Sequence, residues 1–161
     1  MSGFLNPATW FLFLALLPQS LDGQLTLVLS PAELLPDGTA SFQLLLNSSS
    51  ASPSALQWTF RYSPAAIRSI TVDDGPSLLA AGKTVTCAGT SPAYKCLAIG
   101  NNSSTIGAGV IAKVTAALTS AGSLPLLQLC APVAASPGGD SIPISARGCS
   151  PRRPVGKPRD H

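Results

Sequence analysis

The sequence lacks most of the side-chain chemistry on which enzymes depend. Its 161 residues contain one histidine, His161, at the C-terminal end. Ser-His-Asp and Cys-His arrangements place an imidazole beside a nucleophile, so neither can form in the rest of the chain. The carboxylates available for glycoside hydrolysis stand next to turn-forming residues, where aspartate is favoured for capping and solvation alone. They are Glu33, Asp37, Asp73, Asp74 and Asp140. We therefore expect a protein that is not an enzyme.

Metal-binding patterns are scarce as well. The four cysteines do not show C-x-x-C spacing and have no histidine near them, which argues against a zinc site. Asp73 and Asp74 are adjacent and leave open a structural calcium ion, held together with backbone carbonyls. No other cofactor is expected.

Charged residues make up only 11% of the chain, and the net charge of +3 is localised. Residues 150–161 carry four basic residues and one acidic residue, whereas the rest of the chain carries six of each. A neutral body lacks the basic stripe that binds phosphates, so a nucleic-acid-binding surface is not expected. The composition predicts that the basic tail, 150–161, is disordered. The tail either steers the protein to acidic surfaces or only keeps it soluble.

The N-terminal apolar run is too short to span a membrane. Residues 10–17, WFLFLALL, form a run of eight, whereas a bilayer-spanning helix needs about 20 residues. Pro18 and a polar stretch follow, so residues 1–23 are interpreted as a signal peptide. No Lys or Arg precedes the run and no A-x-A motif follows it, so the cleavage site stays open, as does an uncleaved or misassigned start. Stable membrane insertion is not expected.

The four cysteines fit an oxidising compartment, and together with the signal peptide they predict a protein that is secreted, extracellular or periplasmic. Sequence alone permits three pairings. The local pairing, Cys87 with Cys96 and Cys130 with Cys149, needs the least rearrangement. Each bridge would contribute about 3 kcal/mol through loop-closure entropy.

Strand patterns dominate what the sequence does contain. With 14 glycines and 15 prolines it suits short strands joined by tight turns, whereas a helical bundle would need more Glu, Lys and Ala at 3.6-residue spacing. Residues 56–62 alternate strictly, which is typical of a half-buried strand. Leu56, Trp58, Phe60 and Tyr62 share one side, and Gln57, Thr59 and Arg61 share the other. Further strands are predicted at 24–30, 39–47, 84–87, 95–99, 124–130 and 141–146, with a second apolar set at 67–72 and a loose loop at 78–79.

Residues 109–119, GVIAKVTAALT, are the other informative stretch. Ala112, Val114, Ala116 and Leu118 alternate with more polar positions, which predicts a strand. A helix is the alternative, because alanine favours helices.

Four motifs follow one another in a specific order. They are PDGT at 36–39, ALQWTFRYSP at 55–64, KCLAIGNNSS at 95–104 and GAGVIAKVTAAL at 107–118. This series resembles the cohesin domain, a member of the carbohydrate-binding-module-like β-sandwiches, over about residues 25–146. The family shows a P-G-D-x-V turn and then A-x-Q-F-x-[LV]-x-Y-D-P, [RK]-[IV]-A-[FW]-x-[SN] and G-x-[LI]-[AF]-x-[IL]-x-F strands. The sequence departs from it at Ser63, where the family often has Asp, and at Ala116, where it has an aromatic residue.

The resemblance implies an all-β fold: a single jelly-roll β-sandwich of about nine strands, covering residues 24–149 and here stapled by disulfides that are not typical of the family. It also implies a secreted, non-catalytic module that binds a dockerin-type protein, in polysaccharide degradation or at a cell surface. In cohesins the partner contacts the flat outer face of the sheet that contains the central strand. Carried over by position, that face would present Gln57, Thr59 and Arg61, and less directly Lys95.

Two other functions remain open. A carbohydrate-binding module would need a strip of exposed aromatic residues, but Trp58 alternates with core residues and Tyr94 is the one aromatic residue expected in a loop. A structural or adhesive domain would self-associate through an edge strand.

Overall fold

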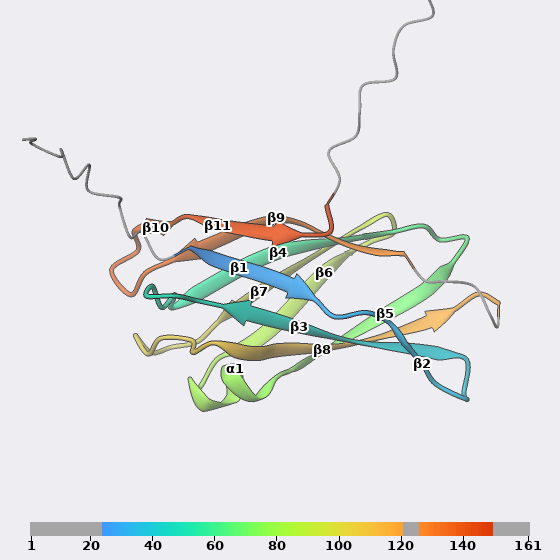
Figure 1. The fold of residues 1–161 in the computed structure, drawn as a ribbon, viewed down its shortest axis with the longest axis horizontal. Helices are drawn as coiled ribbons and strands as arrows, with labels where there is room; N and C mark the ends of the chain where they lie inside the picture. Colours follow the sequence, from blue (N-terminus) through green and yellow to red (C-terminus); the bar gives the residue numbers. More distant parts are fainter. Residues whose placement is uncertain (1–23, 121–125, 150–161) are drawn as a thin grey trace, which may run out of the picture.

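Two β-sheets packed face to face make up the fold in the computed structural model, which describes residues 24–120 and 126–149 (Figure 1). The first sheet holds β1 (Leu25–Leu29), β2 (Glu33–Leu34), β3 (Thr39–Asn47), β5 (Ile67–Asp74), β8 (Gly109–Leu118) and β11 (Ile144–Arg147). The second sheet holds β4 (Ala55–Tyr62), β6 (Thr84–Thr90), β7 (Ala93–Ile99), β9 (Leu127–Ala135) and β10 (Ser141–Ile142).

The strand order is β11-β1-β3-β8-β5 in the first sheet, with β2 beside β3, and β10-β9-β4-β7-β6 in the second. All neighbours are antiparallel except β1 and β11, which are parallel. The expected all-β sandwich is therefore confirmed. The described residues form eleven strands because the two-residue segments β2 and β10 also pair.

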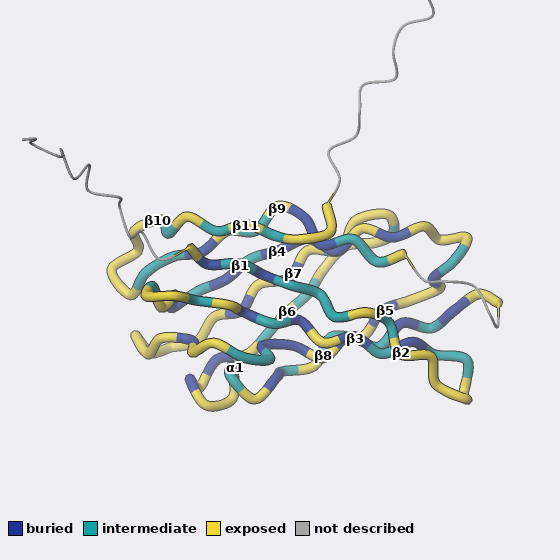
Figure 2. The backbone as a smooth tube through the Cα atoms, in the orientation of Figure 1, coloured by how far each residue is buried: buried dark blue, intermediate teal, exposed yellow. Residues whose placement is uncertain are grey.

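The core lies between the sheets, where the long strands contribute alternate apolar side chains. Buried positions accordingly recur along the strands (Figure 2). Trp58 and Phe60 of β4 are fully buried, with ring centroids 6.3 Å apart and planes at 79°. Such edge-to-face contacts add to the burial of the rings. Trp58 therefore belongs to the core, as its alternation predicts.

The alanine-rich stretch at 109–119 forms strand β8, as predicted. Ala112, Val114, Ala116 and Leu118 are buried, whereas Lys113 is exposed. The strand lies between β3 and β5 and is hydrogen-bonded to both, so tertiary pairing outweighs the helix preference of alanine.

The loose loop expected at 78–79 is wrong, because these residues lie in the short helix α1 (Pro76–Ala80) beside β8 (Figure 1). Pro76 stands in its first turn, where the missing N–H costs nothing. Leu78 is fully buried and anchors the helix to the core. Gly75 precedes the helix at a close backbone approach, since a Cβ there would lie 2.5 Å from the Val110 carbonyl oxygen.

The hairpin around the first cysteine pair is longer than expected. Strands β6 and β7 extend the predicted segments 84–87 and 95–99 until only Ser91 and Pro92 separate them. Tyr94 consequently lies in β7, half-buried against the core, and the expectation that it occupies a loop is wrong.

The C-terminal strands also differ in detail from the expected ones. Strand β9 continues to Ala135, five residues beyond the predicted segment 124–130. Residues 141–146 form two strands in different sheets, β10 and β11, with Pro143 between them. Proline has no N–H for the ladder, so a break there is expected.

The predicted signal peptide, 1–23, and basic tail, 150–161, lie outside the described residues. Within the described ranges, no helix has the length and apolar character needed to cross a membrane.

Candidate partner-binding face

Strand β4 is the middle strand of the second sheet, between β7 and β9. Because its buried side chains fill the core, its alternate residues Gln57, Thr59 and Arg61 lie on the outer face of the sheet. Their neighbours follow from the register, since directly paired residues of antiparallel strands share a face. We call this outer face of β4, β7 and β9 the binding face.

Three rows cross the binding face. Gln57 pairs with Leu97 on β7 and with Val133 on β9. Thr59 pairs with Lys95 and Cys130, and Arg61 pairs with Ala93 and Gln128, in the next two rows. The structure thus places the four predicted residues Gln57, Thr59, Arg61 and Lys95 on one surface.

The four residues differ in accessibility. Arg61 and Lys95 are exposed and Gln57 is half-buried, but Thr59 is only 8% exposed between Lys95 and Cys130. Thr59 therefore offers little area to a partner.

Exposed apolar residues on the binding face were missed by the sequence reasoning. Leu97 is 37% exposed and Val133 50%, and Ile99, two residues beyond Leu97 on β7, is 46% exposed. A sequence signal for Leu97 and Ile99 does exist, because residues 96–99 are apolar on both sides of the strand. Val133 gives no such signal, because it lies in the segment APVAASP at 131–137, where apolar and polar residues do not alternate.

A bulge in β9 shapes the centre of the face. The register with β4 shifts between Gln57 and Thr59, and Ala131 in the bulge has φ 49°. A left-handed conformation is unfavourable for a residue with a Cβ, and bulges commonly redirect side chains beside functional sites.

A groove of about 720 Å³ adjoins the Arg61 end of the face. It lies between the end of β4, the start of β9 and the second disulfide. Its lining residues are Arg61, Tyr62, Ser63, Pro64, Pro92, Leu126, Gln128, Cys130, Ala131 and Cys149. Arg61 is the one charged residue among them, so the groove is suited to an anionic group.

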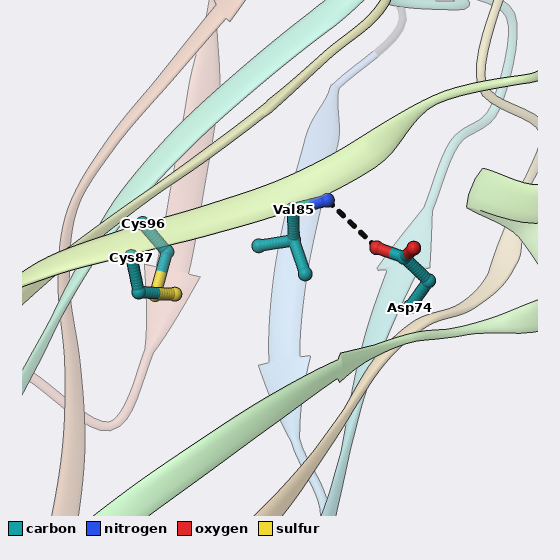
Figure 3. The surroundings of a disulfide bond; sticks show 4 residues. All are labelled: Asp74, Val85, Cys87 and Cys96. Atoms are coloured by element: carbon teal, nitrogen blue, oxygen red, sulfur yellow. Dashed lines mark hydrogen bonds between the residues drawn. A yellow bond between two sulfur atoms is a disulfide. The ribbon is translucent and has the colours of Figure 1, made fainter.

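Both predicted disulfides are present. Cys87 and Cys96 face each other on β6 and β7 with Cα atoms 4.0 Å apart (Figure 3). They lie on the core side of the sheet, because Cys96 pairs with the buried Trp58. Cys130 of β9 is bonded to Cys149, with a Cα–Cα distance of 5.1 Å. This second bridge lies at the edge of the binding face and lines the groove.

The second sheet is purely cationic. Its five strands contain no Asp or Glu, and Arg61 and Lys95 are their only charged residues. Neither side chain has a hydrogen-bond or ion-pair partner among residues 24–120 and 126–149. On the other sheet, by contrast, Lys113 stands directly opposite Asp73.

Two of the five carboxylates considered for catalysis or calcium accept hydrogen bonds that hold local structure. Asp74 accepts a hydrogen bond from the Val85 N–H at 2.7 Å, and Asp37 accepts two from Thr39. In the described part of the chain, no three His, Cys, Asp or Glu residues converge in a way that could hold a metal ion.

Of the three comparisons with known proteins, the one with solved structures finds similar folds. No family model matches the sequence, and no curated protein is detectably similar to it. Solved structures do match. The sixth cohesin of scaffoldin B from Acetivibrio cellulolyticus, in complex with a Cel5 dockerin mutant, has a TM-score of 0.65 at 14% identity, covering 78% of this chain and 95% of that one.

Two further matches come from different organisms. A non-cellulosomal cohesin from the archaeon Archaeoglobus fulgidus has a TM-score of 0.61 at 13% identity, covering 76% of this chain and 86% of that one. A type I cohesin–dockerin complex, Coh-OlpC–Doc435, from Clostridium thermocellum has a TM-score of 0.58 at 14% identity, covering 76% and 88%. The described part of this chain therefore has the cohesin fold.

Proposed function

We propose that this protein is a secreted, non-catalytic binding module that recognises a dockerin-type protein through the binding face. The observation that carries the proposal is the outer face of β4, β7 and β9, which exposes Leu97, Ile99 and Val133 in a group. Exposed apolar groups rimmed by polar residues are typical of protein–protein contacts. Two of the similar cohesin structures are complexes with dockerins.

A protein partner fits this face better than a polysaccharide does. Sugar-binding surfaces stack pyranose rings on exposed aromatic side chains, and the second sheet turns its aromatic residues toward the core. Trp58, Phe60 and Tyr62 are buried, and Tyr94 is half-buried against the core. The two disulfides support an oxidising compartment, extracellular or periplasmic. The proposed setting, polysaccharide degradation or a cell surface, follows from the resemblance of the sequence motifs to those of cohesins.

A pull-down with the purified protein tests the proposal. Calcium-loaded dockerin-type modules and insoluble polysaccharides would be offered in parallel. We expect retention of a dockerin-type module, and we expect Leu97→Asp or Val133→Asp to weaken it by at least about tenfold, roughly 1.4 kcal/mol, because each buries a charge in the contact.

The matched control is Leu34→Asp. Leu34 is 51% exposed, like Val133, but it lies on β2 of the other sheet. All three variants should keep the thermal midpoint of the parent. Retention by polysaccharide alone, or binding that Leu97→Asp and Val133→Asp leave unchanged, would rule out the proposed function.

A further inference from the structure

The binding face has two chemically different ends. At one end Leu97, Ile99 and Val133 surround the half-buried Gln57. Lys95 lies in the middle row and Arg61 in the row at the other end. The two are diagonal neighbours on β7 and β4, because Lys95 pairs with Thr59 rather than with Arg61. Diagonal neighbours in an antiparallel pair are about 7–8 Å apart.

We propose that the partner presents an amphipathic acidic helix to this face, with apolar side chains over the Leu97–Val133 row and carboxylates over Lys95 and Arg61. The inference rests on the proposed function and names the chemistry of its partner. It is carried by charge complementarity. The strands of this sheet contain no carboxylate, so Arg61 and Lys95 would lose hydration on contact with a neutral partner without compensation. Anionic groups on the partner would compensate for that loss.

The spacing of the rows fits a helix that lies along β4. A strand advances about 3.4 Å per residue, so the Thr59–Lys95 row lies about 7 Å from the Gln57 row and the Arg61 row about 14 Å. A helix rises about 1.5 Å and turns about 100° per residue, so positions on the same face as an apolar anchor recur roughly four, eight and eleven residues after it, about 6, 12 and 17 Å along the axis. One carboxylate would therefore follow the apolar anchor by about four residues, and a second by about eight or eleven, within reach of the long Arg61 side chain.

The groove offers the second carboxylate a defined binding site. Arg61 is exposed and lines the groove together with Ser63 and Gln128. Its planar guanidinium can bind both oxygens of a carboxylate, and the neutral polar side chains beside it can donate further hydrogen bonds. Lys95, on the open sheet, provides a less directional contact.

Other occupants match this chemistry less well. A second copy placed face to face would bring Arg61 and Lys95 against cations, since the sheet has no carboxylate to meet them. The chain's own residues 150–161 carry four basic residues and one acidic residue, which is the wrong sign.

A selection experiment tests the partner chemistry. The probe is a dockerin-type module displayed on yeast, with the exposed positions of its contact helix randomised, and selection is made on the full-length protein. We expect the recovered clones to be enriched in Asp and Glu one to three turns from an enriched Leu, Ile, Val or Met. Their affinity should fall at least about tenfold for the double variant Arg61→Gln, Lys95→Gln. The control Lys113→Gln, on the opposite sheet, should leave affinity unchanged.

The outcomes separate the two proposals. The acidic partner is overturned if clones that lose affinity with Leu97→Asp show no acidic enrichment, or if they bind Arg61→Gln, Lys95→Gln as tightly as the parent. Either result would still support the binding face as the contact surface. If no clone is recovered, or if the clones are insensitive to Leu97→Asp, both proposals fail. Selection on the variant Arg61→Glu, Lys95→Glu provides a reciprocal check, because it should enrich Lys and Arg at the same helix positions.

Discussion

Asp37 fixes the turn that leads into β3. The Thr39 hydroxyl and the Thr39 N–H both donate to its Oδ1, at 2.6 and 3.0 Å. These hydrogen bonds, the hydroxyl first, hold the pKa of the Asp37 carboxyl below its ordinary value of 3.8. A lowered folded-state pKa stabilises the fold above the unfolded-state value, and this stabilisation is lost as the pH falls through the folded-state value.

The expected consequence is a difference in acid sensitivity between the parent and Asp37→Asn. Well above pH 3.8 the parent should have the higher thermal midpoint, because only the carboxylate strengthens the Thr39 bonds by its charge. As the pH falls below 3.8 the two midpoints should converge. Thermal unfolding followed by circular dichroism between pH 2.5 and 7 would be the measurement. A constant difference across that range would contradict this account of Asp37.

At the scale of elements, a buried lysine joins three connections. Lys83, 1% exposed, lies between α1 and β6, and its Nζ donates to Ser54 Oγ at 3.1 Å and to the Asn102 carbonyl oxygen at 2.7 Å. Ser54 precedes β4 and Asn102 follows β7, so the lysine ties the start of β4 to the end of β7, the two strands that carry most of the binding face.

Lys83→Ala should lower the free energy of unfolding by about 2–4 kcal/mol, because it leaves buried acceptors without a donor and empties the space of the side chain. Lys83→Met should cost less, since it refills that space. Urea unfolding measures both. A free energy of unfolding for the alanine variant within about 0.5 kcal/mol of the parent, the scatter expected for surface changes, would show that these hydrogen bonds do not stabilise the fold.

The free edge of the second sheet is protected by a residue of the first. Strand β6 lies at that edge, and Asp74 at the end of β5 accepts the Val85 N–H at 2.7 Å (Figure 3). Unpaired N–H groups at an edge invite pairing with another chain, and a charged side chain prevents it. The carboxylate therefore opposes self-association through β6.

Asp74→Ala should both destabilise the fold, by about 1–3 kcal/mol, and promote dimers or larger species. Asp73→Ala is the matched control, because Asp73 is adjacent but faces Lys113 on β8. Urea unfolding and sedimentation velocity would report the two effects. If both variants showed the same stability and the same degree of association, Asp74 would have no protective role at this edge.

At the scale of the whole molecule, the second disulfide connects the two sheets. Cys130 lies in β9 of the second sheet and Cys149 follows β11 of the first, whereas Cys87 and Cys96 join strands that are already paired. Each bridge should stabilise the fold by about 3 kcal/mol through its effect on the unfolded chain. Their local effects should differ.

Cys130→Ser, Cys149→Ser is expected to raise amide hydrogen exchange in β11 and in its partner β1, because that edge loses its covalent tie to β9. Cys87→Ser, Cys96→Ser should leave exchange in β11 close to that of the parent. Mass spectrometry of exchanged peptides distinguishes the two. Unchanged exchange in β11 without the second bridge would contradict this role.

The extent of sequence-based prediction follows from the range of each interaction. Strands β3, β4 and β8 could be predicted because alternation is imposed locally by the pleat. The disulfide pairing could be predicted from short separations of 9 and 19 residues. The end of β9 and the burial of Lys83 could not, since each depends on partners distant in sequence: Ala135 pairs with Ala55, and Lys83 bonds Ser54.

The sequence by itself determined that Gln57, Thr59 and Arg61 share one side of a strand, opposite its apolar side, because side-chain direction in a strand has a period of two. Only the tertiary structure decided what stands beside them. Placing β4 between β7 and β9 brings Lys95 and Leu97 to one flank and Val133 to the other, across separations of about 40 and 76 residues. Register between distant strands is set by hydrogen bonding and burial across the whole sheet, which no local pattern records.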